Sequence, residues 1–396
     1  MIELGYGLRP LPLTLPPGLV AEVLAPPAPP PLADLRAGLA EALAHPVGSR
    51  PLRQLATAKS RAVVIVSDGS RHEPRAELFA AVRAELGALA DDQVTLAVAN
   101  GTHQPGPLEE LGLPAEVLRR HRVVNHDSRD EAQLVEVGRT SRGTRLRVNR
   151  CLVEADLIVT TGRIKPHYFA GYGGGTKGIF PGLGAEADIR QNHLLKADPG
   201  STLGRADGNP CREDLEEAAR RLGRDTFMLN VVEAGGVITG AVAGDIVLAH
   251  REGVRQLERW VEVRAVPAPL VVVSAPLPVS GSLYQASKLV PPAGLLLRDG
   301  GVVILAAECP GGTGPLTTVN EAIFALGVRR FLPERYTLLL VSGLAEATVR
   351  QTYARHAASL EAAVAEAARL IGGRGRVLVM PDAGDLVPVP QPLPGS

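Results

Sequence analysis

Short runs of aliphatic and β-branched residues alternate along the chain with longer segments in which apolar residues recur at helical spacing. The strand-like runs cover 61–68, 93–101, 155–162, 268–276, 300–308, 335–343 and 376–382. Strands that alternate with helices are typical of α/β layers built on a parallel sheet. The pattern predicts an α/β fold of two domains, each a largely parallel sheet with flanking helices.

Two of the intervening segments have clear helical periodicity. Residues 75–90 place apolar side chains three and four positions apart, and residues 211–223 do the same before a glycine stop. A third segment, 251–268, is interpreted as a helix or connector. Because 396 residues exceed the usual size of a single core, we place a domain boundary there, giving an N-terminal domain 1–265 and a C-terminal domain 266–396. The proline-rich final tail is expected to pack back on the N-terminal domain.

Composition narrows the class of protein. Basic and acidic residues both number 42, so no global field attracts nucleic acid, and we expect no nucleic-acid partner. The start lacks a signal-peptide layout, and no uncharged apolar run reaches the length of a membrane span. These observations predict a cytoplasmic protein without a membrane partner. Three scattered cysteines without CxxC pairing are interpreted as small buried residues.

Polar residues follow each of the first three predicted strands. Asp68, Ser70 and Arg71 follow the first, His103 follows the second, and His167 follows the third. Open α/β sheets bind ligands beyond the carboxyl ends of their strands, so these groups are expected at one edge. Arg71 is suited to clamp a carboxylate or phosphate, and pairing with Asp68 at a helix start is an equal alternative.

A lysine lies within the most glycine-rich part of the chain, 171–182. It resembles a phosphate-binding loop, but Thr176 precedes Lys177 and Gly178 follows it. The hydroxyl that should follow the lysine and bind magnesium is therefore missing. The residues alone leave Lys177 without an assigned role.

Other side chains left alternatives open. Three histidines beside a cleft suit a zinc hydrolase, although their spacing matches no compact zinc motif. Gln285 and Lys288 are three positions apart, so on a helix they share a face and either converge on one carboxylate or form a solvated surface.

Several motifs in a fixed order carry a family resemblance. The motifs are YG near the start, DGSR at 68–71, NGTH at 100–103, PHYFAGYGGGTKGIFPG at 166–182, NH at 192–193, DGNP at 207–210, LYQASK at 283–288 and ECPGGTG at 308–314. With them the chain resembles the nickel-dependent lactate racemase family over almost its whole length. Serine at position 70 is a departure, because family members often carry threonine there.

The resemblance implies a cofactor, the nickel-pincer nucleotide, a pyridinium-3,5-bisthiocarboxylic acid mononucleotide that grips nickel. It implies covalent attachment at Lys177 and His193 as a nickel ligand, and a single imidazole beside sulfur donors suits nickel rather than zinc. It further implies that Asp68, Ser70, Gly173, Gly174 and Gly175 contact the cofactor. Its phosphate is expected on backbone N–H groups of the glycine turns.

The family's activity supplies the remaining expectations. His103 and His167 match its two catalytic bases, and Arg71, Tyr284, Gln285 and Lys288 match residues that bind substrate. The resemblance implies racemisation or epimerisation of a small, lactate-like 2-hydroxy acid by proton-coupled hydride transfer through a 2-keto acid, in an interdomain cleft. The N-terminal domain would bind the cofactor, which separate biosynthesis enzymes would supply. The alternatives are a non-catalytic sensor of an organic acid or nucleotide, and the zinc hydrolase.

Overall fold

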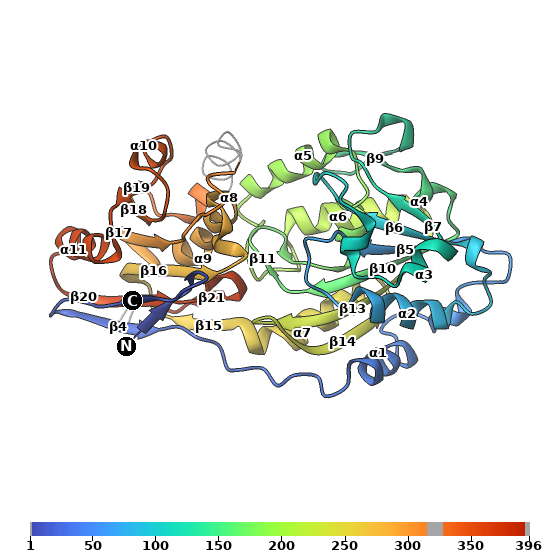
Figure 1. Ribbon diagram of the computed structural model, residues 1–396, viewed down its shortest axis with the longest axis horizontal. Helices are drawn as coiled ribbons and strands as arrows, with labels where there is room; N and C mark the ends of the chain where they lie inside the picture. Colours follow the sequence, from blue (N-terminus) through green and yellow to red (C-terminus); the bar gives the residue numbers. More distant parts are fainter. Residues whose placement is uncertain (1, 315–327, 393–396) are drawn as a thin grey trace. The chain divides into compact units, whose positions relative to one another are not determined.

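A computed structural model describes residues 2–314 and 328–392, and its chain divides into two compact units (Figure 1). One unit is the contiguous stretch Ala28–Arg259, and the other joins Met1–Pro27 to Trp260–Ser396. The predicted α/β fold with largely parallel sheets is confirmed in both units. Each unit is described separately below.

The contiguous unit is built on a six-stranded sheet in the order β14-β13-β10-β5-β6-β7. Its strands are β5 (Ala62–Ser67), β6 (Val94–Ala99), β7 (Arg122–Asn125), β10 (Leu157–Ile164), β13 (Asp225–Ala234) and β14 (Val237–Gly244). Neighbours pair in parallel except β13 and β14, which form an antiparallel pair. The three strands predicted in this half are therefore the centre of one sheet.

Helices cover this sheet. They are α1 (Leu35–Ala44), α2 (Arg75–Glu85), α3 (Ala115–Arg120), α4 (Arg150–Glu154), α5 (Glu186–Leu194), α6 (Pro210–Arg221) and α7 (Leu248–Val261). Alternate strand residues such as Val64 and Val66 pack with α1 and α2 in one buried cluster. On β5, Ile65 points the other way, toward the short helix η5 (Gly175–Gly178). The lysine-bearing glycine segment thus lies against the sheet.

Smaller elements complete this unit. A hairpin joins β8 (Leu134–Arg139) to β9 (Arg145–Asn149), and the two-residue strands β11 (Pro166–His167) and β12 (Gly171–Tyr172) pair in antiparallel register. This second pairing folds the glycine-rich segment back on His167.

The other unit has a seven-stranded sheet in the order β19-β18-β17-β16-β20-β4, with β2 paired to β16. The strands are β2 (Tyr6–Gly7), β4 (Leu19–Val23), β16 (Ala268–Pro276), β17 (Leu297–Ala306), β18 (Tyr336–Val341), β19 (Arg355–Ala357) and β20 (Gly375–Met380). All of these pairs are parallel. Beside the sheet, β1 (Ile2–Leu4) pairs with β3 (Leu11–Leu13).

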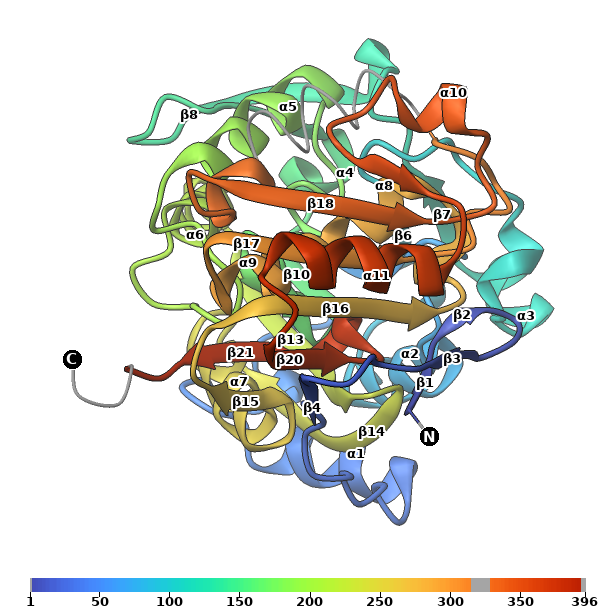
Figure 2. The same ribbon diagram turned by 90° about the vertical axis from the view of Figure 1, so that its left-hand side faces the viewer.

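Two apolar clusters lie on opposite faces of this sheet. Val271 and Val273 pack with residues of α9 (Val290–Leu295), whereas Leu270 and Val272 pack with residues of α11 (Leu360–Leu370). Figure 2 shows α11 lying over the sheet. The remaining helices of this unit are α8 (Leu283–Ala286) and α10 (Glu346–Val349). Strands buried on both faces explain the uninterrupted apolar runs of the sequence.

The division of the chain differs from the boundary expected at residues 265 and 266. Residues 1–27 belong with the C-terminal half, because β4 pairs in parallel with β20. The last described strand, β21 (Val387–Pro390), pairs with β15 (Glu262–Ala265), and both belong to the unit that contains residues 260–396. Pairings between residues hundreds of positions apart leave no local pattern, so the sequence did not reveal them.

The cysteines lie in the protein interior. Cys151, Cys211 and Cys309 are free thiols and are buried, as predicted. Burial raises the pKa of the Cys151 and Cys309 thiols to about 12 and that of Cys211 to about 11. In the part of the chain that is described, none of the helices combines the length and apolarity needed to cross a membrane.

Candidate active site

The turn after β5 is organised by the carboxylate of Asp68. Its Oδ1 accepts a hydrogen bond from Ser70 N at 2.8 Å and a short one from the Ser70 hydroxyl. Its Oδ2 lies 3.2 Å from His103 Nδ1 and 3.9 Å from Arg71 Nε. One carboxylate therefore joins the predicted polar groups of two neighbouring strand ends.

The protonation of this pair follows from its donors. Burial alone would raise the pKa of the Asp68 carboxyl, but hydrogen bonds from His103 and Ser70 and the charge of Arg71 hold that pKa well below its usual range. An ionised carboxylate can only accept hydrogen bonds, so His103 Nδ1 carries the proton. The lone pair of the neutral imidazole is then on Nε2, and the side chain is 47% exposed.

Arg71 meets both interpretations of its role. It lies beside Asp68, yet its side chain is 50% exposed. A half-exposed guanidinium with one long contact to a carboxylate keeps other N–H donors for an anionic ligand.

Arg75 binds the main chain of the same turn. This residue was not predicted from the sequence. Its guanidinium donates to the carbonyl oxygens of Ser67 and Leu111, and makes short bonds to those of Asp68 and Arg71. Glu73 Oε1 lies 3.7 Å from its Nε. One rigid group that donates to four carbonyl oxygens thus fixes the main chain that carries Asp68 and Arg71.

The second predicted base, His167, lies in an aromatic cluster. Its ring stacks on Tyr168 and meets Phe169 edge-on at 4.7 Å between centroids. Its Nδ1 accepts the Ala170 N–H at 3.2 Å. The neutral ring must therefore carry its proton on Nε2, which lies 3.4 Å from Lys177 Nζ.

Phe169 is the common neighbour of three predicted residues. Besides His167, its ring meets that of His193 at 5.1 Å, and Lys177 Nζ lies 6.0 Å from its centroid. Lys177 comes from η5 and His193 from α5. The structure brings the lysine and the two histidines around one buried ring.

A second lysine lies in this region and was also missed. Burial lowers the pKa of Lys196 to about 8, and the Cys211 thiol interacts with it electrostatically. The same thiol interacts electrostatically with Lys177. Two lysines therefore share a neighbour, and burial leaves a fraction of the Lys196 amine uncharged near neutral pH.

The glycines of the segment pack against protein groups. A Cβ at Gly171 would meet Arg205 O, and one at Gly174 would lie 2.7 Å from Asn230 Oδ1. Both residues have positive φ, +74° and +76°. Two of the N–H groups expected to bind a phosphate already have partners, since Gly173 N donates to Lys165 O and Gly175 N to Asn230 Oδ1. The glycines are thus explained by close packing and turn conformation.

The donor set fits the implied cofactor better than a zinc ion. Within residues 2–314 and 328–392, no three side chains of His, Cys, Asp or Glu are grouped to hold a metal. A zinc site of three histidines needs such a group. A metal held by one histidine and by sulfur atoms of a bound organic group does not, and His193 shares the Phe169 ring with the lysine that would attach that group.

Three of the four predicted substrate contacts, all except Arg71, belong to the other unit. Tyr284 and Gln285 lie on α8, and Lys288 lies in the following turn, η8 (Ser287–Leu289). Lys288 Nζ donates to Gln285 Oε1 at 2.7 Å and lies 4.9 Å from the Tyr284 ring centroid. The predicted shared face of Gln285 and Lys288 is confirmed.

Comparisons with known proteins agree with these features. Residues 6–204 match the family described as the lactate racemase N-terminal domain. Proteins named lactate racemase from Thermoanaerobacterium thermosaccharolyticum and Lactiplantibacillus plantarum are 33% and 30% identical to this chain over 287 and 281 residues. Each alignment covers 69% of this chain and 66% of the relative, just under two thirds of its length.

Solved structures extend the likeness to the whole chain. The lactate racemase apoprotein from Thermoanaerobacterium thermosaccharolyticum superposes with a TM-score of 0.85 at 27% identity, covering 98% of this chain and 99% of that one. A Thermotoga maritima protein gives a TM-score of 0.62 at 15% identity over 90% and 97% of the two chains. At that identity the second likeness concerns the fold alone.

The low pKa of Asp68 predicts a pH-dependent loss of stability. Because this pKa lies below the unfolded value of about 3.9, the ionised carboxylate stabilises the fold above that pH and stops doing so as pH falls. Asp68→Asn should lower the free energy of unfolding by roughly 1 to 2 kcal/mol at neutral pH. Urea unfolding at several pH values should show this difference narrowing below about pH 4.

Asp92→Asn, at an exposed position, is the control and should leave the free energy of unfolding nearly unchanged. A cost for Asp68→Asn that stays constant down to about pH 2 would contradict the assigned ionisation.

Proposed function

This chain belongs to the lactate racemase family, and from that premise we propose that it is an isomerase that interconverts the enantiomers of a small, lactate-like 2-hydroxy acid. The observation that carries the proposal is the contrast between His103 and His167. His103 has its proton on Nδ1 facing Asp68, whereas His167 accepts at Nδ1 and carries its proton on Nε2. The Nδ1 atom of one histidine donates and that of the other accepts. Such a pair suits a reaction that removes and returns a proton.

His103 is proposed as the base in the state that the structure describes. The substrate hydroxyl must lose its proton as the Cα hydrogen leaves with its electron pair, because the resulting carbonyl is neutral. His103 Nε2 accepts that proton, and Asp68 stabilises the imidazolium that forms. Asp68 thus has a positioning and electrostatic role.

His167 is proposed to serve the opposite enantiomer. In the described state its Nδ1 accepts the Ala170 N–H, which leaves the proton of the neutral ring on Nε2, 3.4 Å from Lys177 Nζ. To accept a proton at Nε2, His167 must exchange its tautomer and release Ala170. The two histidines are therefore not equivalent before the reaction starts.

The cofactor proposed for this site is the nickel-pincer nucleotide, attached at Lys177 with His193 as the nickel ligand. When bound, it would accept the Cα hydrogen as a hydride and return it to either face of the planar 2-keto acid. The shared contact of Lys177 and His193 with Phe169 supports this assignment. Asp68, Ser70 and Gly173–Gly175 are retained as cofactor contacts through their side chains or main chain.

Substrate binding is assigned to Arg71, Tyr284, Gln285 and Lys288. A 2-hydroxy acid presents one carboxylate and one hydroxyl, which match the guanidinium of Arg71 and the ammonium of Lys288. The bond from Lys288 to Gln285 orients the ammonium group. We further propose that separate biosynthesis enzymes deliver the cofactor and that the protein works in the cytoplasm.

Attachment at Lys177 predicts a mass change. Protein made together with the cofactor-synthesis enzymes should be heavier than protein made alone, and Lys177→Ala should remove the increase. Lys196→Ala is the matched control, because Lys196 is a buried lysine whose pKa is lowered to about 8. Intact-protein mass spectrometry and peptide mapping distinguish the two lysines. A modified peptide that contains Lys196 would refute attachment at Lys177.

The nickel assignment predicts weaker metal retention in His193→Ala. Loss of the single imidazole ligand should lower the nickel content after dialysis by roughly 10- to 100-fold. Elemental analysis of loaded protein measures the ratio of nickel to protein. His45→Ala, whose side chain is 73% exposed, serves as control, and equal nickel content in the two variants would exclude His193 as a ligand.

The two-base proposal predicts opposite enantiomer preferences. His103→Ala and His167→Ala should each abolish racemisation, with losses of about 10²- to 10⁴-fold in the direction served by the missing base. Each variant should still convert a trace of the enantiomer served by the other base into 2-keto acid. Single-turnover absorbance with D- and L-substrate measures this preference, and the same preference in both variants would rule out paired bases.

A further inference from the structure

The main chain that leads to Lys177 has all its carbonyl oxygens occupied. Between Phe169 and Gly174, each carbonyl accepts a hydrogen bond from a group outside this stretch. The stretch contains three glycines, so little in its own side chains restricts its backbone. Its conformation must come from the groups that bind its carbonyls.

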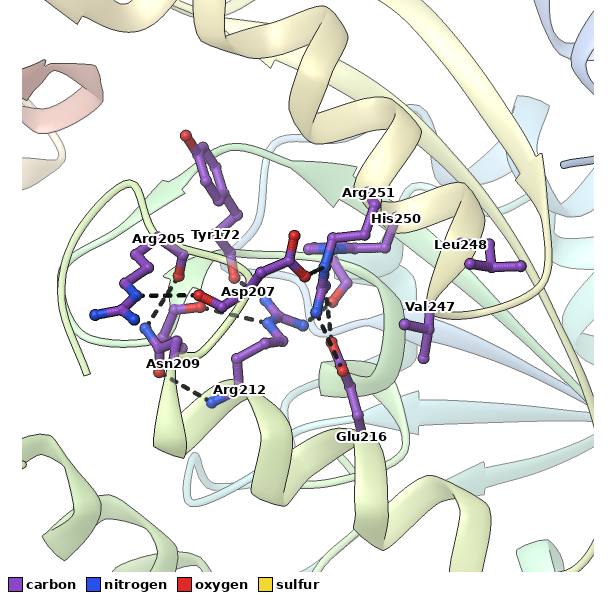
Figure 3. A network of polar contacts seen from close by, with 12 residues as sticks. Tyr172, Arg205, Asp207, Asn209, Arg212, Glu216, Val247, Leu248, His250 and Arg251 are labelled. Atoms are coloured by element: carbon purple, nitrogen blue, oxygen red, sulfur yellow. Dashed lines mark hydrogen bonds and ion pairs between the residues drawn. The ribbon is translucent and has the colours of Figure 1, made fainter. Parts of the chain in front are cut away.

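Arg212 supplies three of these hydrogen bonds. Its Nε lies 3.4 Å from Ala170 O, one terminal nitrogen lies 3.3 Å from Gly174 O, and the other makes a short bond to Tyr172 O. Figure 3 shows its side chain reaching from α6 toward Tyr172. One planar group therefore fixes three alternate positions of the segment.

Neighbouring groups bind the other three carbonyls. Asn209 Nδ2 donates to Phe169 O at 2.9 Å, and Gly204 N donates to Gly171 O at 3.3 Å. His250 Nε2 lies 2.8 Å from Gly173 O and must donate, because a carbonyl only accepts. Asn209 also accepts from Arg212 N, so the DGNP motif at 207–210 both starts α6 and holds the segment.

Arg212 is buried and positively charged, and the neighbouring carboxylate of Glu216 is bound to Arg251. Burial lowers its pKa to about 10, which still leaves the guanidinium charged at neutral pH. The charge of Glu216 acts against this lowering of the Arg212 pKa. The Glu216 carboxylate lies 2.8 Å from Arg251, which also contacts Asp207 (Figure 3). Burial and the charge of Arg212 hold the pKa of His250 well below its ordinary value, so His250 is neutral.

We propose that Arg212, supported by Asn209 and His250, is the positioning residue that holds residues 169–174 in the form that presents Lys177 for cofactor attachment. The part of this inference that concerns cofactor attachment rests on the proposed function. The structural restraint on residues 169–174 does not. The ligand concerned is the cofactor nucleotide, and the role is carried by the shape of the guanidinium group. A charge alone would not serve, because three carbonyls must be bound at once.

The decisive variant is Arg212→Lys. Lysine keeps the positive charge but has one nitrogen, which cannot span three carbonyls. In the apo protein, hydrogen exchange in the peptide covering 169–178 should become faster by roughly tenfold or more, while exchange in β5 and β10 stays unchanged. In coexpressed protein, the rate of mass gain should fall roughly 10- to 100-fold.

Arg251→Lys is the matched control. It makes the same chemical change in the same network, at a residue that binds Glu216, Asp207 and His250 Nδ1 and none of the carbonyls of 169–174. A lysine at 251 can still donate to His250 Nδ1. We expect its exchange in 169–178 and its mass gain to stay within about twofold of the unchanged protein.

Every outcome decides the proposal. Arg212→Lys with normal exchange and normal mass gain would overturn it, as would equal effects of both substitutions, since these indicate a general need for charge. If Arg212→Lys does not fold, His250→Phe decides, because it leaves Arg212 in place and removes the bond to Gly173 together with the Arg251 contact at His250 Nδ1. Faster local exchange supports the restraint, and unchanged exchange refutes it. If the unchanged protein never gains mass, the proposed function fails, and the exchange measurement still tests Arg212.

Discussion

Buried guanidinium groups bound to main-chain carbonyls are the interaction on which the candidate site depends. The turns beyond the strand ends contain carbonyls that no strand can pair, and burying them unpaired is costly. Arg75 binds those of the β5 turn, and Arg212 binds those of the glycine segment. Asp68 and Arg71 lie in the turn whose carbonyls Arg75 binds, and Lys177 follows the segment whose carbonyls Arg212 binds.

The turn after β6, which carries His103, is joined to the glycine segment. Gly101 N donates to Gly182 O at 2.9 Å, which ties the turn that carries His103 to the end of the glycine segment. Asn100 adds a second restraint through its bonds to Asn125 and the His126 carbonyl. His103 is consequently held by both its neighbours in the chain and the Asp68 carboxylate.

The central parts of the fold could be predicted because buried parallel strands are continuous apolar runs. The ranges 61–68 and 268–276 coincide with β5 (Ala62–Ser67) and β16 (Ala268–Pro276) within a few residues. The order of the motifs identified the residues at the strand ends. The crowding of the glycines against Arg205 and Asn230 is visible only in three dimensions. The sequence does contain a signal for Arg75 and Arg212. Each is a charged residue at helical spacing within a buried stripe, with Leu78 and Val82 in α2 and with Leu215 and Ala219 in α6.

The pairing of β4 with β20 has a consequence for biosynthesis. Ala28–Arg259 is contiguous, so this unit is complete as soon as its last residue has left the ribosome and can fold while translation continues. The other sheet cannot close then, because Leu19–Val23 must wait for Gly375–Val379, which are synthesised near the end. The chain therefore carries an unpaired strand at its front throughout most of its synthesis. Until Gly375–Val379 emerge, the main-chain groups of Leu19–Val23 lack their native partners.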